Sequence, residues 1–167
     1  MANKVRSESP ANYGCIPSSA SKAAEDKVIQ SALDILRRRY KRDTVFASPS
    51  DSINYLKLHC ANYEHEVFGI IHLDNRNRVI DIEELFQGTI DGCSVYPRQV
   101  VKSVLQHNAA AILLFHNHPS GVAEPSQADI AITHRLKTAL ATIDVRILDH
   151  IIVAGDDNTS FNDRGLI

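Results

Sequence analysis

The stretch AAAILLFHNHPSGVAEPSQAD, residues 109–129, decides which fold this chain can adopt. Its first seven residues form a continuous apolar run of strand length, which predicts a strand buried on both faces. Pro119 stops strand pairing just beyond that run, and Ser126 is typical of the residue that opens a helix, here one reaching to about Ala141. A buried strand that leads into a helix indicates a mixed α/β domain with polar side chains at the strand end.

Two histidines at that strand end could bind the same ion. His116 and His118 alternate along an extended chain, so they project to one side while Asn117 projects to the other. Gly121 and Pro125 allow the following loop to fold back toward the strand. A side chain from the next helix can then approach the two imidazoles.

Asp129 is the candidate for that third donor. It falls on the same helical stripe as Ile132, Leu136 and Leu140, so we expect its carboxylate to point inward. A buried carboxylate needs a cation or several hydrogen bonds. Two imidazoles and one carboxylate leave a fourth tetrahedral position for water, which is the pattern of a catalytic zinc site. Such a site also needs a second carboxylate to move protons.

A capping arrangement is the alternative interpretation of the same residues. In the segment SQAD, Ser126 can act as the N-cap of the helix while Asp129 reaches back from the third helical position. The histidines would then be ordinary loop residues. The neighbouring HxHP pattern at a strand end favours the metal site over capping alone.

The remaining chain alternates between helical and strand patterns. We predict helices over Lys22–Tyr40, from Pro49 to about Leu58, and from Pro97 through a buried stripe of Val100, Val101, Val104 and Leu105 to Asn108. We predict a hairpin of strands 66–74 and 78–86, a short strand at 94–96, and a strand over 145–155 followed by an Asp-Asp-Asn turn. The fold class is α/β (α+β) with one domain.

Length, composition and charge restrict the class of protein. A chain of 167 residues with 44% hydrophobic content can bury one sizeable core, and a net charge of −2 gives no global support for nucleic-acid binding. The three cysteines form no CxxC pair, and we find neither a signal peptide nor a membrane span, so we expect a cytoplasmic protein. We divide the chain into a flexible tail (1–21), an N-terminal helix (22–44) and the domain (45–167).

The motifs resemble those of a known family. A glutamate followed by HxHP and SxxD resembles the signature of JAMM metalloproteases, whose domain is also called MPN. More narrowly, EVFGIIHLDNRNRVIDIEELFQGTI, SVYPRQVV, FHNHPSG and LDHIIVAG look like the RadC family of bacterial proteins, over about residues 45–167. The resemblance implies a JAMM/MPN-like (cytidine-deaminase-like) fold, a curved mixed sheet flanked by helices.

The resemblance also implies roles for individual residues. By motif position, His116, His118 and Asp129 are similar to the ligands of a catalytic Zn²⁺, Glu66 to the general acid/base, and Ser126 to the serine that stabilises an oxyanion. Three other acidic residues compete with Glu66 for the role of base, namely Glu64, Glu83 and Glu84.

The function implied is that of a zinc-dependent hydrolase of peptide or isopeptide amide bonds, with no substrate indicated. The competing hypothesis is a non-catalytic metal-binding scaffold in DNA repair or mobile-element biology, with Arg37, Arg38 and Arg39 contacting phosphate. A solvated helix end is the simpler interpretation of those arginines. Longer RadC proteins resemble this domain plus a helix-hairpin-helix module, and the short form resembles RadC-like proteins of mobile elements.

Two other residues, His150 and Cys93, are predicted to have structural rather than functional roles. His150, within a predicted strand, is taken as a core or surface histidine rather than a partner of the metal ligands, and Cys93 as a small buried hydrophobe.

Overall fold

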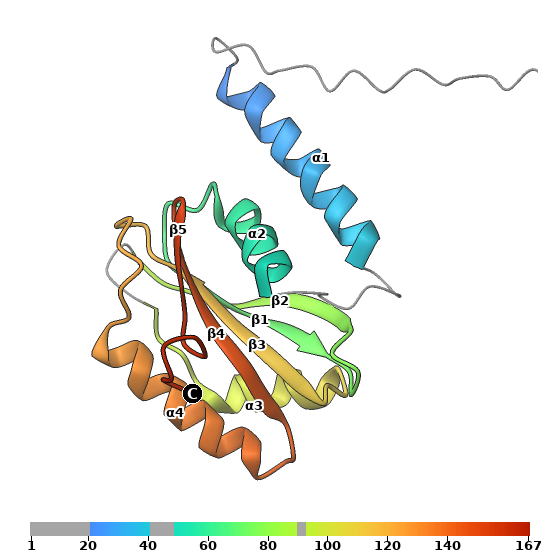
Figure 1. The fold of residues 1–167 in the computed structure, drawn as a ribbon, viewed down its shortest axis with the longest axis vertical. Coiled ribbons are helices and arrows are strands. Elements are labelled where there is room, and N and C mark those ends of the chain that lie inside the picture. The colour runs from blue at the N-terminus through green and yellow to red at the C-terminus, as the bar shows by residue number, and fades with distance from the viewer. Residues whose placement is uncertain (1–20, 41–48, 90–92) are drawn as a thin grey trace, which may run out of the picture.

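A computed structural model describes residues 21–40, 49–89 and 93–167, and shows a mixed α/β domain (Figure 1). Its sheet contains five strands in the order β2-β1-β3-β4-β5. Their bounds are β1 (Val67–Leu73), β2 (Val79–Gln87), β3 (Ala111–Asn117), β4 (Arg146–Ala154) and β5 (Asp157–Ser160). The four helices among the described residues are α1 (Lys22–Tyr40), α2 (Pro49–Cys60), α3 (Pro97–Gln106) and α4 (Gln127–Ala141).

Strand pairing fixes where the polar residues of the central strands lie. β1 pairs antiparallel with both β2 and β3, β4 pairs antiparallel with β5, and β3 runs parallel to β4. Parallel neighbours need a long crossover connection, which α4 provides. The carboxyl end of β3 and the first turn of α4 therefore meet at the same edge of the sheet.

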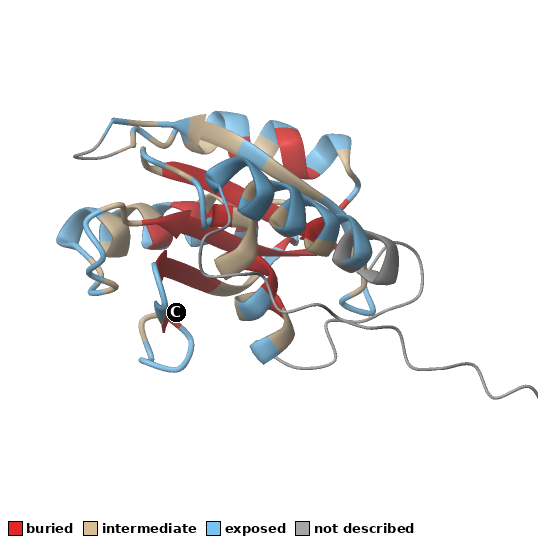
Figure 2. Cartoon of the chain, turned by 90° about the horizontal axis from the view of Figure 1, so that it is seen from above, coloured by how far each residue is buried: buried red, intermediate tan, exposed pale blue. Residues whose placement is uncertain are grey.

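Two hydrophobic cores cover the two faces of the sheet. In β3, Leu113 and Phe115 pack on the side of α1 and α2, whereas Ile112 and Leu114 pack on the side of α3 and α4. This alternation follows from the period of two in a strand. Because both faces are covered, every residue of β1 and β3 is buried, and Figure 2 shows these strands between the helices.

Some of the predicted elements are wrong. Residues 94–96, predicted as a strand, have no regular structure and lead directly into α3. Leu105 is 59% exposed although its spacing predicted burial, while the polar Ser103 is buried on α3 instead. β5 begins at Asp157, inside the predicted turn, because the turn closes at the Gly155–Asp156 pair.

Several predictions concern residues outside the described part of the chain. Residues 1–20 of the expected tail and residues 41–44 of the expected N-terminal helix lie outside the described residues. So do the side chains of Arg37, Arg38 and Arg39. None of the helices in the described ranges is both long and apolar enough to cross a membrane.

Gly69 provides a test of how closely the two central strands are packed. It pairs with Phe115, and an added Cβ would lie 2.2 Å from the Phe115 ring and 2.8 Å from the carbonyl oxygen of Glu83. We expect Gly69→Ala to lower the free energy of unfolding by about 3 kcal/mol, since the buried ring has nowhere to move.

Urea denaturation of Gly69→Ala and Gly165→Ala measures the difference. Gly165 has open space around it and a φ of 67°, so the second variant carries only the left-handed backbone cost of about 1–2 kcal/mol. Equal losses in the two variants would show that the contact over Gly69 is not tight.

Candidate metal centre

Three side chains converge at the end of β3. His116 is the penultimate residue of the strand, His118 follows it, and Asp129 lies in the first turn of α4. The Nε2 atoms of the two histidines are 2.9 Å apart, and the Asp129 oxygens lie 3.4 Å from His116 Nε2 and 3.7 Å from His118 Nε2. The structure thus brings together the three residues that the sequence predicts as ligands.

The hydrogen-bond partner of His118 determines which of its nitrogens can bind an ion. Its Nδ1 lies 2.7 Å from the carbonyl oxygen of Val122, which can only accept, so Nδ1 carries the proton. The Nε2 lone pair is therefore directed at His116 and Asp129.

A chain of buried hydrogen bonds determines which ring nitrogen of His116 carries the proton. Thr133 donates its hydroxyl proton to the carbonyl oxygen of Asp129 at 2.6 Å, so it must accept from His150 Nδ1 at 2.7 Å. His150 Nε2 is then an acceptor, and it receives the proton of His116 Nδ1 at 2.8 Å. His116 Nε2 is left with a lone pair, and this nitrogen also faces Asp129.

The convergence of these electron pairs fits a cation. Two imidazole lone pairs and a carboxylate oxygen repel one another unless a positive charge lies between them. Ligand atoms about 2.0–2.1 Å from a zinc ion lie about 3.3 Å apart at a tetrahedral angle. The separations of 2.9, 3.4 and 3.7 Å are close to that value.

Asp129 serves the helix and the site at once. Its Oδ2 accepts from the backbone N–H of Ser126 at 2.7 Å and from the Ser126 hydroxyl at 2.6 Å, and the Ser126 oxygen accepts from the Asp129 N–H. This is the capping box of the alternative interpretation. Oδ1 remains for His116, so capping and metal binding are compatible in this structure.

The pKa shifts at this site follow from burial and from Asp129. Burial lowers the pKa of His116 to about 4, so the ring stays neutral. The Asp129 carboxylate, which accepts a hydrogen bond from the protonated His118 ring, raises the pKa of His118. Burial alone would raise the pKa of Asp129, but the combined pull of His118, His116 and Ser126 holds it below its usual value. A carboxylate beside a neutral imidazole is the protonation state that metal binding requires.

Glu66 lies immediately before β1, close to the three converging residues. Its backbone pairs with Gly88 and Thr89, which extends the β1–β2 ladder by one residue. Its side chain is half-buried, and burial raises the pKa of its carboxyl group. The charge of His118 lowers this pKa, and the charge of Asp129 raises it. A carboxyl group with a raised pKa is suited to proton transfer.

The competing acidic residues are engaged elsewhere. Glu64 is exposed and lies 3.8 Å from Lys22. Glu84 accepts from the Tyr63 hydroxyl, and Glu83 accepts from the Ser103 hydroxyl. Geometry thus favours Glu66 over the alternatives that the sequence left open.

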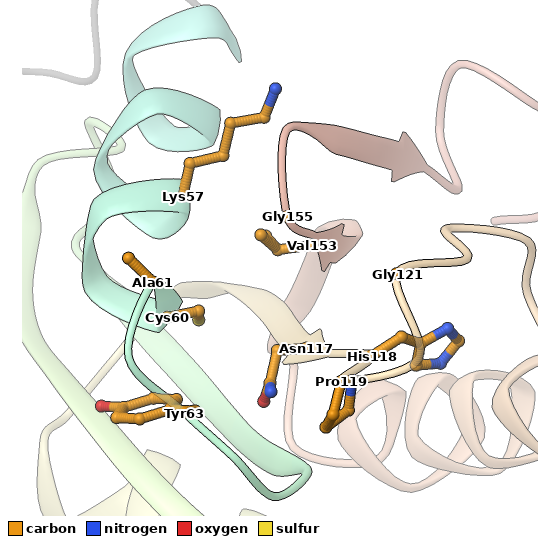
Figure 3. A pocket seen from close by; sticks show the side chains of 10 residues that line it. All are labelled: Lys57, Cys60, Ala61, Tyr63, Asn117, His118, Pro119, Gly121, Val153 and Gly155. Carbon is orange, nitrogen blue, oxygen red and sulfur yellow. The ribbon is translucent and has the colours of Figure 1, made fainter.

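An open pocket of about 220 Å³ adjoins His118. Figure 3 shows Asn117, His118 and Pro119 on one side of it, with Lys57, Cys60, Ala61 and Tyr63 of α2 and the following turn on the other. Lys57 donates to the backbone carbonyl of Asp156. Of the three converging residues, only His118 lines it, and the pocket lies toward α2, on the side of Asn117.

His150 is the residue whose contact the sequence interpretation missed. It is fully buried, as expected of a core histidine, but it also holds His116. The parallel register pairs it with Leu114, two residues before His116, and this puts it on the same face. Sequence alternation within 145–155 hints at that face, but the register itself is not visible in the sequence.

Cys93, which the sequence predicts to be a small buried hydrophobe, is half-buried, and burial raises the pKa of its thiol.

Comparison with known proteins identifies a family likeness. The model of the RadC-like JAB domain matches residues 46–166. Two UPF0758 proteins of Vibrio cholerae are 49% identical over 146 residues (87% of this chain, 92% of theirs) and 52% identical over 141 residues (84% and 89%). A UPF0758 protein of Nitrosococcus oceani is 53% identical over 143 residues, which are 83% of this chain and 64% of that protein. These names state no activity.

The buried hydrogen-bond chain can be tested through metal affinity. His150→Phe keeps an aromatic ring between Phe68 and Phe161 but removes the acceptor for His116, and Thr133→Val removes only the hydroxyl. We expect the first change to weaken Zn²⁺ binding by about 10–100-fold, and the second by less, because the ligand ring is no longer held.

Competition with a chromophoric chelator measures these affinities, with circular dichroism to verify folding. His134→Ala is the matched control, because His134 is exposed on α4 outside the site. If both variants fold and bind Zn²⁺ with wild-type affinity, His150 serves only to pack the core.

Proposed function

The chain belongs to the RadC-like JAB domain family, and from that premise we propose that it is a zinc-dependent hydrolase of peptide or isopeptide amide bonds. The observation that carries the proposal is the convergence of two imidazole lone pairs and one carboxylate oxygen, each with its remaining polar atoms bonded elsewhere. Two nitrogen donors and one oxygen donor suit zinc, and a three-ligand set is that of a catalytic ion.

His116, His118 and Asp129 would hold the ion. A zinc ion bound there supplies Lewis acidity, which lowers the pKa of water toward neutrality and polarises an amide carbonyl.

Glu66 would move the proton in this reaction. Its carboxylate takes a proton from the attacking water as the C–O bond forms, and gives that proton to the amide nitrogen as the C–N bond breaks. One water is consumed, and a carboxylic acid and an amine are released. The raised pKa of Glu66 favours the first transfer, since a weaker acid is a better base.

Ser126 would contribute through its hydroxyl. That hydroxyl donates to Asp129 Oδ2 in the structure, so it must turn to reach an oxyanion. The carboxylate keeps its bond from the Ser126 backbone N–H when this happens.

The role of Glu66 is tested by Glu66→Gln, with Glu64→Gln as a matched control two residues away. We expect Glu66→Gln to retain zinc but to lose turnover by about 100-fold or more, because the amide cannot accept the proton. The measurement is chelator-sensitive, zinc-restored cleavage of a panel of peptide and isopeptide amides, with zinc content determined alongside. Equal turnover in Glu66→Gln and wild type would remove Glu66 from the mechanism, and no cleavage by the zinc-loaded wild type would contradict a hydrolase.

The role of Ser126 is tested by Ser126→Ala. We expect the lost N-cap to reduce the free energy of unfolding by about 1 kcal/mol, and kcat at saturating zinc to fall by about 100-fold with little change in KM. Steady-state kinetics and urea denaturation measure the two effects. Wild-type kcat in the loaded variant would restrict Ser126 to positioning Asp129.

A further inference from the structure

Asn117, between the two candidate ligands His116 and His118, has a side chain that is only 4% exposed and makes two hydrogen bonds to a distant part of the chain. Its amide oxygen accepts from the backbone N–H of Val67 at 2.8 Å, and its amide nitrogen donates to the backbone carbonyl of His65 at 3.0 Å. The two partners flank Glu66, the proposed base. We call this pair of hydrogen bonds the Asn117 clamp.

The clamp continues the β1–β3 ladder where backbone pairing stops. The last pair between the two strands is Phe68 with His116, and by the same register Val67 is opposite Asn117. The N–H of Val67 nevertheless donates to the side-chain oxygen of Asn117. A side-chain amide carries the same donor and acceptor as a peptide group, so it can take the place of the backbone at this position.

The backbone of Glu66 is bonded on its other side. Its N–H donates to the carbonyl of Thr89 at 3.1 Å, and its carbonyl accepts from the N–H of Gly88 at 2.8 Å. Successive residues of a strand direct their backbone groups to opposite neighbours, so residues 65 and 67 face β3 while Glu66 faces β2. Bonds on both sides fix the orientation of the backbone at Glu66, and the direction of its Cβ is fixed with it.

This direction leads toward the candidate metal centre. Alternation along the strand places the side chains of Glu66 and Phe68 on one face, and the Phe68 ring stacks on His116 with the centroids 6.1 Å apart. Asn117 projects to the other face, toward α2 (Figure 3). The clamp therefore holds the backbone from one side while the carboxyl group extends on the other. A displacement of about 1 Å in a reacting group can cost about 100-fold in rate.

We propose that Asn117 is a positioning residue for Glu66, which fixes the distance from that carboxyl group to the ion site by bonding the backbone on both sides of it. The inference rests on the proposed hydrolase function and deepens it. In the segment His116–Asn117–His118, the outer two residues would hold the ion and the middle one would set the base. One strand end would then determine the geometry of both.

Asn117→Ala, which removes both bonds of the clamp, tests the proposal. We expect kcat to fall by about 10–100-fold at saturating zinc, with KM and zinc affinity near their wild-type values, because the contacts to substrate and ion remain. Steady-state kinetics and chelator competition measure these quantities. Wild-type kcat in the zinc-loaded variant would overturn the proposal.

Asp74→Ala is the matched control at the opposite end of β1. It removes the bonds that the Asp74 carboxylate accepts from the backbone N–H groups of Arg76 and Arg78, at 2.8 and 2.9 Å, and should leave kcat unchanged. If Asn117→Ala does not fold, Asn117→Asp decides. That variant keeps the acceptor for Val67 but places a carboxylate against the carbonyl of His65, so kcat should fall by about tenfold. Wild-type kcat in folded Asn117→Asp would equally overturn the proposal.

A double-mutant cycle with Glu66→Gln identifies the residue through which Asn117 acts. In the Glu66→Gln background, Asn117→Ala should lower kcat by less than about twofold, because the group that it positions is already absent. A purely structural role would not produce this difference between backgrounds. An equal fold-loss of kcat in both backgrounds would contradict the proposal.

Amide hydrogen exchange measures the clamp without any activity. The N–H of Val67 should exchange about tenfold faster in Asn117→Ala, whereas that of Ile71, in the middle of β1, should keep its protection. Unchanged exchange at Val67 would overturn the proposal. Faster exchange at Val67, together with no cleavage by the zinc-loaded wild type, would support the clamp and count against the hydrolase alone.

Discussion

The parallel pairing of β3 with β4 is the constraint on which the rest of the structure depends. Because parallel strands cannot be joined by a tight turn, the chain leaves β3 at Asn117 and returns through α4. The first turn of α4 consequently lies near the carboxyl end of β3, and Asp129 meets His116. The same pairing brings His150 beside His116. The site is thus produced by backbone hydrogen bonding, before any attraction among its own side chains is considered.

The two oxygens of Asp129 explain why stability and chemistry are not in conflict here. A carboxylate buried at a metal site is expensive without a cation, and many proteins compensate with remote contacts. In this chain one oxygen is satisfied by the start of its own helix, where the positive end of the helix dipole also favours a negative charge. The carboxylate is therefore already ionised and oriented, and it keeps the second oxygen for His116. Capping and metal binding compete as interpretations of the sequence, but this arrangement of Asp129 is compatible with both.

The sequence predicts what depends on local periodicity and on short segments. The bounds of α2, of the β1–β2 hairpin and of α4 follow from apolar spacing and from Ser126, and the meeting of His116, His118 and Asp129 follows from alternation plus a crossover. What it does not predict depends on register between distant segments. The contact of His150 with His116, and that of His72 with Ser103 and His107, require knowing which residues of two strands or of a strand and a helix are opposite each other. Leu105 is exposed because the exact rotation of α3 on the sheet buries Ser103 instead.

The face of the sheet that carries α3 and α4 is polar at both ends and apolar between them. Ile70, Ile112 and Leu114 form the middle, where Leu136 and Leu140 cover them. Polar side chains are tolerated at the ends because helix termini there present unpaired backbone groups. The two termini differ in sign: the N-terminus of α4 holds the carboxylate of Asp129, whereas the C-terminus of α3 offers the carbonyl of Ser103 to His107. A helix C-terminus favours positive charge, and at this end two carboxylates add to it.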